Sequence, residues 1–284
     1  NVSYSIERIG GPKLIRKYRK AYLVNDFIKN NKNIKGVIAD HWKSLELIKT
    51  NKKKICLIHS KEINHKKGSL LNKRVLKVLN NIDYVVSNSK FTENLAINSG
   101  VDGKKIIVIN PGVEPSKELS KEILFEAEDM LQHKNPRLIT VSRLEKRKNH
   151  EKIIMSLRNL KQLYPNIIYT CIGYGEEEEN IKKLVKELNL ENQVLFLKNI
   201  SQELKNALLA KSNVFVMPSI IHKKSVEGFG IAYIEANAVE RPVIGSCLGA
   251  TPDTIVDGVF FECPSNSVFG RKECLQSHAG RIGK

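Results

Sequence analysis

Several features are missing from this 284-residue sequence, and each absence excludes a class of protein. No apolar run approaches the roughly 20 residues that a membrane-spanning helix requires. The first residues, "NVSYSIERIGG", contain no apolar signal-peptide core, so we expect a protein without a secretion signal. They also contain no initiator Met, and we therefore expect a fragment of a longer chain.

Cysteine is scarce and shows no metal-binding or disulfide pattern. The cysteines are Cys56, Cys171, Cys247, Cys263 and Cys274, an odd number without any Cys-x-x-Cys motif. Cys56 and Cys171 lie inside apolar, strand-like segments, which favours buried, reduced thiols in a cytosolic protein. We expect no metal site from this set.

Acidic residues are few in the first part of the chain. The net charge is +17, but residues 1–115 hold 23 Lys and Arg against 9 Asp and Glu, whereas the remainder holds 24 against 21. The basic part suggests an anionic partner such as a membrane surface, a nucleic acid or a phosphorylated substrate. A genome-wide bias towards Lys, Asn and Ile would explain the same excess. Nucleic acid is the least favoured partner, because no recognisable nucleic-acid-binding module is present.

Short apolar runs alternate with helical patterns along most of the chain. The expected strands are 36–40, 54–60, 84–89, 105–113, 137–143, 167–175, 194–199, 214–219 and 242–246. Helical stretches between them include 147–163, 176–189, 201–210 and 230–240. Nearly continuous apolar strands separated by helices predict an α/β fold with parallel sheets covered on both faces.

The strand series is interrupted once, around residues 111–136, by a polar helical segment and three prolines. We therefore expect two Rossmann-like domains, a partial one at 1–115 and a second at 137–258, joined by a linker at 116–136. Residues 259–284 follow neither pattern, and we expect a poorly ordered tail there.

The segment "SVEGFGIAYIEANAVERPVIG" (225–245) carries the most informative pattern. Glu227 and Glu235 are eight positions apart, and Gly228-Phe229-Gly230 lies between them at the start of an expected helix. In α/β folds, ligands bind at the carboxyl ends of parallel strands, and free amides at a helix start attract phosphates. Carboxylates beside such a site suit sugar hydroxyls, so the pattern indicates a nucleotide-sugar site. Two solvated glutamates around a packing glycine are the alternative.

Two cations follow an earlier strand. Arg143 ends the strand 137–143, and Lys148 opens the next helix. Cations in these positions can neutralise a departing diphosphate without a metal ion, and the sequence contains no Asp-x-Asp pair for a metal-dependent route. The tight turn Gly173-x-Gly175 follows the next strand, but it lacks the third glycine of a dinucleotide-binding fingerprint.

In combination, these elements resemble the retaining, family-4 glycosyltransferases of GT-B fold. The matching elements are Arg143 with Lys148, the Gly173–Gly175 turn, "VFVMPS", the Glu-x7-Glu pair and "PVIGSCLGATPDTIVDG". "KICLIHSKE" and "DYVVSNSKFTENL" are similar to the N-terminal domain of that family, so the resemblance covers roughly residues 30–258. It implies two Rossmann-like domains facing a cleft, with the N-terminal domain incomplete and the chain truncated at both ends.

The resemblance implies a role for each matched residue. Arg143 and Lys148 would contact the donor diphosphate and stabilise the leaving nucleotide. Glu227 would hold hydroxyls of the transferred sugar and Glu235 those of the ribose, while His59 would reach the donor sugar from the first domain. The other implied donor contacts are Gly173, Gly175, Lys198, Asn199, Ile200, Gly228, Phe229, Gly230 and Ile231.

The sequence also departs from the family pattern. Asn149 stands where the family frequently has glycine after the lysine, and we expect it to be tolerated as a helix cap. Leu248 replaces a glycine that often approaches the phosphate, and Asp253 stands where Glu is usual.

The activity that the resemblance implies is transfer of a hexose from a UDP-, GDP- or ADP-sugar to an acceptor hydroxyl. Anomeric configuration would be retained, with no metal and no other cofactor. The acceptor would be a glycan, a glycolipid or a lipid-linked sugar of cell-envelope polysaccharide biosynthesis. The basic helix at 13–30 favours contact with an anionic membrane, so we expect a cytoplasmic protein at the inner face of the plasma membrane. Two alternatives are a catalytically incompetent nucleotide-sugar-binding fragment and a GT-B sugar-nucleotide epimerase.

Overall fold

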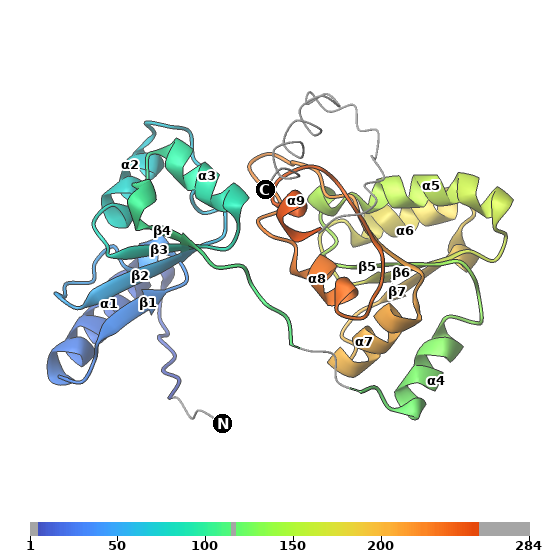
Figure 1. Ribbon diagram of the computed structural model, residues 1–284, viewed down its shortest axis with the longest axis horizontal. Helices are drawn as coiled ribbons and strands as arrows, with labels where there is room; N and C mark the ends of the chain where they lie inside the picture. The colour runs from blue at the N-terminus through green and yellow to red at the C-terminus, as the bar shows by residue number, and fades with distance from the viewer. Residues whose placement is uncertain (1–4, 115–117, 256–284) are drawn as a thin grey trace, which may run out of the picture. The chain divides into compact units, whose positions relative to one another are not determined.

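The computed structural model describes residues 5–114 and 118–255 and divides the chain into two compact units, Asn1–Asn110 and Pro111–Lys284. Each unit is built on one parallel sheet with helices on both sides (Figure 1). The α/β prediction is therefore confirmed. All nine expected strands form, and each ends earlier than expected because the chain turns at that point into a loop at the carboxyl edge of its sheet.

The first unit contains a four-stranded sheet in the order β1-β2-β3-β4. Its strands are β1 (Gly36–Ala39), β2 (Lys53–Ile58), β3 (Tyr84–Ser87) and β4 (Ile106–Val108). Helix α1 (Lys13–Asn30) lies on one side of the sheet, and α2 (Leu70–Leu79) and α3 (Lys90–Ser99) lie on the other (Figure 1). Short 3-10 helices occupy Trp42–Ser44 and Gly103–Lys105. Apolar side chains from the strands and helices form one buried core, in which Trp42 is fully enclosed.

The second unit contains a five-stranded sheet in the order β7-β6-β5-β8-β9. Its strands are β5 (Arg137–Val141), β6 (Ile168–Ile172), β7 (Val194–Leu197), β8 (Val214–Met217) and β9 (Val243–Gly245), and every neighbouring pair is parallel. The chain moves outward from β5 to β7 and then returns to place β8 on the other side of β5. The strand order therefore reverses between β5 and β8, and such a switch point is where open α/β sheets bind ligands.

Two apolar layers cover the second sheet, one on each face. Helices α5 (His150–Leu163) and α6 (Glu178–Glu187) pack in one layer with Tyr169 and Cys171 of β6. Helices α4 (Lys121–Met130), α7 (Gln202–Lys211) and α8 (Ile231–Asn237) pack in the other with Ile139, Phe215 and Met217. Helix α9 (Thr251–Thr254) and 3-10 helices at Lys146–Lys148 and Glu191–Gln193 complete the described part of the unit.

Helix α4 lies inside the stretch 116–136 that we expected to be a linker. Ala127 and Leu131 are fully buried in the same core layer as the α7 residues Leu204 and Leu208, and α4 packs along α7. The structure therefore assigns α4 to the second unit, and the boundary lies at Asn110–Pro111. The sequence did not predict that α4 packs on the second unit, because charged residues dominate the helix and only a few apolar positions make its contact with α7. The expected tail at 259–284 lies outside the described residues.

We expect Leu131→Ala to lower the free energy of unfolding of the second unit by about 2–5 kcal/mol, because it would leave a cavity in a core layer. Phe125→Ala is the matched control on α4, the helix that Leu131 directly follows, since Phe125 is 74% exposed. Its effect should stay within about 0.5 kcal/mol. Urea unfolding followed by far-UV circular dichroism measures both. Equal, small effects would mean that α4 is a linker after all.

Candidate functional site

The loops that follow β5 and β8 bring a carboxylate and two cations together at the switch point of the second sheet. Glu227 Oε2 accepts hydrogen bonds from Lys148 Nζ (2.6 Å), Arg147 Nη1 (2.6 Å) and Ser219 Oγ (3.1 Å). Glu227, Lys148 and Arg147 are all buried. We call these three residues the cation–carboxylate cluster. Two positive charges meet one negative charge inside the protein, so the cluster carries an excess positive charge.

The electrostatics of the cluster follow from burial and proximity. Burial raises the pKa of Glu227, but the nearby Lys148 and Arg147 outweigh it, so that the pKa is lowered and the side chain is a carboxylate at neutral pH. Burial lowers the pKa of Lys148, and the attraction of Glu227 opposes this only in part. Removing Glu227 would leave two buried cations without their shared carboxylate, which costs about 3–5 kcal/mol.

Arg147 is the member of the cluster that sequence reasoning missed. In "LEKRKNH" it is one of several neighbouring charges, and nothing in its spacing separates it from the exposed Lys146. The 3-10 helix Lys146–Lys148 turns Arg147 and Lys148 inward together. Arg147 Nε is buried and has no hydrogen-bond partner among the described residues, so the guanidinium retains an unused donor beside the cluster.

Arg143 lies apart from the cluster. Its side chain is 65% exposed, and Nη1 pairs with Glu145 Oε1 at 2.5 Å. Glu145 also lies 3.8 Å from Arg147 Nη2. Arg143 is therefore a solvent-facing cation at the carboxyl end of β5, and its predicted diphosphate contact stays a prediction.

Asn149 forms the turn between Lys148 of the cluster and the first residue of α5. Its backbone is left-handed, with φ 59° and ψ 34°, and its side chain makes no capping hydrogen bond. The Asn149 side-chain amide instead donates to Pro218 O (3.2 Å), which ties the loop after β5 to the loop after β8. Asn149 therefore stands at the N-cap position of α5, as expected, but its side chain does not cap the helix. Asn is tolerated here because, after glycine, it is among the residues that enter the left-handed region most readily.

Glu235 occupies a separate place on α8. Its Oε1 accepts from Lys205 Nζ of α7 at 2.7 Å, and both side chains are partly exposed. The two glutamates of the Glu-x7-Glu pair thus have different partners. Glu227 belongs to the buried cluster, and Glu235 lies on the short helix that follows it.

Gly228, Phe229, Gly230 and Ile231 connect the two glutamates. Helix α8 is shorter than expected and begins at Ile231, after Gly230 with a left-handed φ of 95°. A β-carbon on Gly230 would lie 2.5 Å from the ring of Tyr233, so only glycine fits beneath that ring. Phe229 is buried, whereas Ile231 is exposed. The Tyr233 hydroxyl in turn donates to Met217 O at the end of β8.

The turn after β6 packs on the loop after β5. A β-carbon on Gly173 would lie 1.9 Å from Ser142 O, and one on Gly175 would lie 2.4 Å from Leu144 O. Leu144 N donates to Tyr174 O at 2.9 Å, which joins the two loops. Both glycines are thus required by close backbone packing, and their predicted donor contact stays a prediction.

Lys198, Asn199 and Ile200 follow β7 at the same carboxyl edge. Lys198 is 60% exposed at its side chain and lies 3.6 Å from Glu178. Asn199 is left-handed, with φ 55°. Ile200 packs against the core layer of α7 and α8, so its side chain is structural.

His59 belongs to the first unit. It follows β2, and its Nε2 lies 2.6 Å from Oδ1 of Asp40, which follows β1. The carboxyl edge of the first sheet therefore carries an exposed histidine–aspartate pair. The sequence singled out His59 but missed Asp40; its position directly after a neighbouring strand was the available signal.

His150 opens α5 next to Lys148 and is buried in a polar chain. Nδ1 lies 2.8 Å from the Tyr169 hydroxyl, and Nε2 lies 3.1 Å from Ser142 Oγ. Burial, with the nearby positive charge of Lys148, lowers the pKa of His150 from 6.5 to about 4. The ring therefore stays neutral at physiological pH and joins the β5 loop to β6.

We expect the second unit to lose about 2 kcal/mol of stability from His150 between about pH 7 and pH 5. The folded pKa of about 4 lies below the unfolded value of 6.5, so the unfolded chain binds more protons in this window and stability falls as pH falls. His150→Gln keeps hydrogen-bonding capacity without titration and should remove this part of the loss. Urea unfolding of both proteins at the two pH values measures it, and an identical loss in both would contradict the assignment.

Two further observations bear on the type of site. Within residues 5–114 and 118–255, no three His, Cys, Asp or Glu side chains cluster in a way that would hold a metal ion. No helix in the same ranges has both the length and the apolar character needed to cross a membrane.

The fold and the site together define a class: a chain of two Rossmann-like units with a polar, cationic site at a sheet switch point. Residues 124–269 match the model of the family "Glycosyl transferases group 1", which is more than half of the chain. The chain belongs to this family, as the resemblance in its sequence implied.

Curated relatives support the same conclusion. The chain is 32% identical over 125 residues to a GDP-mannose-dependent alpha-(1-6)-phosphatidylinositol monomannoside mannosyltransferase of Mycolicibacterium smegmatis, a match that covers 43% of this chain and 33% of that protein. It is 31% identical over 172 residues to the amylovoran biosynthesis glycosyltransferase AmsK of Erwinia amylovora, covering 60% of this chain and 41% of that protein. The matches thus span well under half of these relatives.

Solved structures share the fold. A glycosyltransferase from Rickettsia africae superposes with a TM-score of 0.73 at 21% identity, covering 98% of this chain and 75% of that one. The Anabaena protein Alr3699/HepE, solved in complex with UDP-glucose, gives a TM-score of 0.69 at 18% identity, covering 90% of this chain and 71% of that one. The fold is therefore the GT-B type of α/β structure that we expected.

Proposed function

We propose that this chain transfers a hexose from a nucleoside-diphosphate sugar to an acceptor hydroxyl with retention of anomeric configuration. The observation that carries the proposal is the cation–carboxylate cluster of Arg147, Lys148 and Glu227 at the β5–β8 switch point. A nucleotide sugar offers a diphosphate for the cations and hydroxyls for the carboxylate. Both chemistries that the sequence pattern suggested are thus present in one buried cluster.

The excess positive charge of the cluster suits a leaving group that gains negative charge. As the bond between the sugar and the diphosphate breaks, charge builds up on the phosphate oxygen, and Lys148 and Arg147 stabilise it most at that moment. The free Nε donor of Arg147 supplies a further hydrogen bond. When the cations turn to the phosphates, Glu227 is released to accept hydrogen bonds from the sugar hydroxyls.

The cluster contains no group suited to act as a strong base. The Glu227 carboxylate has a lowered pKa, which makes it a weak base. We therefore propose that the departing phosphate itself takes the proton of the acceptor hydroxyl, on the face from which it leaves. Charge neutralisation by Arg147, Lys148 and Arg143 needs no metal ion, and unchanged activity in EDTA would support this part.

Glu235 has one carboxylate oxygen fixed by Lys205, which orients the other. We propose that the second oxygen accepts hydrogen bonds from the ribose.

The backbone amides of Phe229, Gly230 and Ile231, between the two glutamates, are proposed to contact the phosphates. Backbone groups of residues 198–200, at the end of β7, are proposed to line the base pocket, and the turn at Gly173 and Gly175 to lie beside the donor. His59 is proposed to contact the donor sugar.

The names of the relatives guide the choice of substrate. The Mycolicibacterium relative uses GDP-mannose and a phosphatidylinositol mannoside, and a relative from Campylobacter jejuni acts on a diphospho-undecaprenol acceptor. We propose a lipid-linked or glycolipid acceptor, with GDP-, UDP- and ADP-sugars as the donors to compare.

We expect Lys148→Met to weaken donor binding by about 10–100-fold, since a hydrogen bond to a charged group contributes about 1.5–3 kcal/mol. Calorimetry of the full chain with UDP, GDP and ADP and their sugars measures the dissociation constants. Lys146→Met is the control, because Lys146 is the exposed neighbour in the same 3-10 helix, and it should change binding less than twofold.

Equal losses in the two variants, or no binding of any nucleotide, would overturn the assignment of the site. The reaction is tested separately by release of nucleoside diphosphate in the presence of lipid-linked acceptors. A sugar nucleotide altered without any acceptor would instead indicate an epimerase. Binding without turnover would indicate a chain that holds the donor but lacks catalysis.

Helix α1 carries the proposed membrane contact. Ile15, Tyr18 and Tyr22 are exposed along one stripe of α1, beside the exposed Arg16 and Arg19. Aromatic and cationic side chains on one exposed helix face suit the interface of an anionic membrane. Lys17 and Lys20 point elsewhere, since Lys17 pairs with Glu46 (2.6 Å) and Lys20 donates to Ser44 (2.8 Å). We propose that the protein works in the cytoplasm, at the inner face of the plasma membrane.

We expect Arg16→Gln/Arg19→Gln to weaken binding to phosphatidylglycerol-containing vesicles by roughly 30-fold, because each basic residue near an anionic surface contributes about 1 kcal/mol. Co-sedimentation measures the partition. Lys73→Gln/Lys104→Gln removes the same charge from exposed positions elsewhere in the first unit and should have a smaller effect. Indistinguishable losses would argue against a contact through α1.

A further inference from the structure

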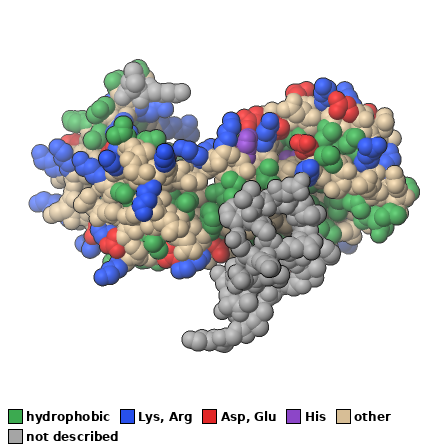
Figure 2. Space-filling model, turned by 90° about the horizontal axis from the view of Figure 1, so that it is seen from above, with side chains coloured by type: hydrophobic (Ala, Val, Ile, Leu, Met, Phe, Trp, Pro, Cys, Tyr) green, Lys and Arg blue, Asp and Glu red, His purple; other side chains and the backbone are tan. Residues whose placement is uncertain are grey.

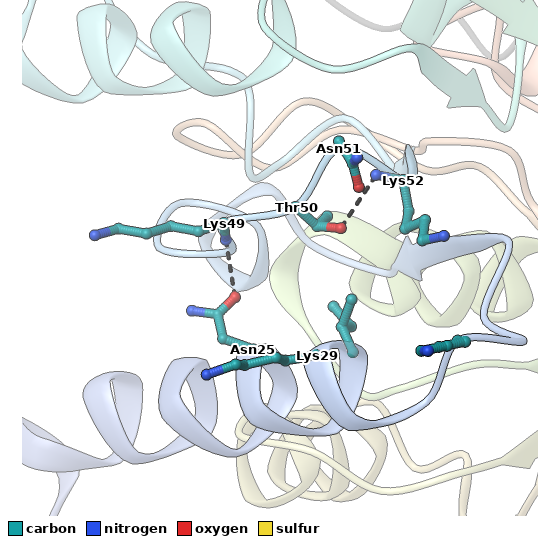
Figure 3. Close-up of a pocket in the computed structure, with 8 residues that line it drawn as sticks. Asn25, Lys29, Lys49, Thr50, Asn51 and Lys52 are labelled. Atoms are coloured by element: carbon teal, nitrogen blue, oxygen red, sulfur yellow. Dashed lines mark hydrogen bonds between the residues drawn. The ribbon is translucent and has the colours of Figure 1, made fainter.

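A pocket of about 500 Å³ lies in the first unit, away from the residues discussed so far. It lies between the last turns of α1 and the loop that leads into β2 (Figure 3). Its lining consists of Asn25, Ile28, Lys29, Lys32, Lys49, Thr50, Asn51 and Lys52. Lys52 directly precedes β2, so the pocket is at the amino edge of the sheet, whereas His59 and Asp40 follow strands at the carboxyl edge.

The charge of the lining is entirely positive. Four of its eight residues are lysines, and none is acidic. Among the described residues, no carboxylate forms an ion pair with any of these four lysines, although Lys17, Lys53 and Arg74 of the same unit do have acidic partners. Four like charges around one hollow repel one another, and a bound anion relieves that repulsion.

The walls of the pocket are tied together by hydrogen bonds. Asn25 of α1 accepts from Lys49 N (2.8 Å) and donates to Leu47 O (3.1 Å), which fastens the loop to the helix (Figure 3). Thr50 Oγ1 accepts from Lys52 N at 3.1 Å, which leaves its hydroxyl proton available to a ligand. Asn25 therefore holds the loop against α1, and the lysines extend from these two segments. Their flexible side chains allow the ammonium groups to converge on a ligand.

We propose that this pocket binds a phosphate-bearing anion with at least two negative charges, such as a diphosphate or the phosphate of a lipid headgroup. Its volume is that of a small-ligand site, and lysine ammonium groups are established phosphate ligands. The carboxyl end of α1 also faces this region and disfavours an anion, but a helix end carries about half a charge against four full charges. Figure 2 shows further Lys and Arg side chains scattered over the visible face of the first unit, and their positive charge attracts anions towards it.

The probe is inorganic pyrophosphate, titrated calorimetrically at low salt into the full chain carrying Lys148→Met, because the cation–carboxylate cluster is itself proposed to bind a diphosphate. We expect saturable binding that weakens roughly tenfold in Lys29→Gln/Lys49→Gln, which removes one cation from each wall of the pocket. Lys73→Gln/Lys104→Gln removes the same net charge from exposed sites of the same unit and should leave the affinity within about twofold. Circular dichroism confirms that both variants fold.

A second titration separates the two sources of phosphate. Stronger binding of the wild-type chain than of Lys29→Gln/Lys49→Gln to phosphatidic-acid vesicles, with Arg16 and Arg19 intact in both, assigns the pocket to a lipid headgroup. Equal vesicle binding together with the pyrophosphate difference assigns it to a soluble phosphate compound. Equal effects of the two lysine pairs on pyrophosphate binding, or no binding of pyrophosphate or of vesicles, would overturn the proposal. Nucleotide-sugar binding that depends on Lys148 is independent of all these outcomes.

Discussion

The second unit depends on the shared carboxylate of Glu227. One oxygen of this side chain holds Lys148 from the loop after β5 and Ser219 from the loop after β8, and Arg147 approaches the same oxygen. The loops that meet here follow the neighbouring parallel strands β5 and β8. Without a carboxylate between them, two buried cations would face each other at that point, which is electrostatically unfavourable. The cluster thus joins the loop after β5 to the loop after β8, and it is also the source of the positive charge of the site.

Backbone geometry supports the cluster on each side. Asn149 adopts the left-handed turn that allows Lys148 to face inward while α5 begins immediately afterwards. Its amide bond to Pro218 O joins the same two loops that Glu227 joins. On the other side, Ala250 N donates to Glu227 O at 2.9 Å, so the main chain of Glu227 is fixed by the loop after β9. The loops around the cluster are therefore held by hydrogen bonds that do not involve the side chains of Lys148 and Arg147.

The two units present different chemistry at their sheet edges. The second has a buried cluster with an excess positive charge, suited to a specific anionic ligand. The first has an exposed His59–Asp40 pair at its carboxyl edge and an unpaired set of lysines at its amino edge. Of the 23 basic residues in the first 115 positions, four line this pocket, and Arg16 and Arg19 lie on the exposed face of α1.

The sequence by itself determined the nine strands, their parallel pairing and the loops that carry Lys148 and Glu227, because buried parallel strands leave continuous apolar runs and site loops follow their carboxyl ends. It also determined the family, through the combined spacing of several weak motifs. Only the tertiary structure decided three points. Arg147, and not Arg143, contacts Glu227, and the Asn149 side chain does not cap α5. Helix α4 belongs to the second unit. The physical reason is common to all three. Arg147 contacts Glu227, Asn149 contacts Pro218, and α4 packs on α7. In each case the partner lies about 70 to 80 positions away in the chain, so the local sequence pattern does not predict the contact.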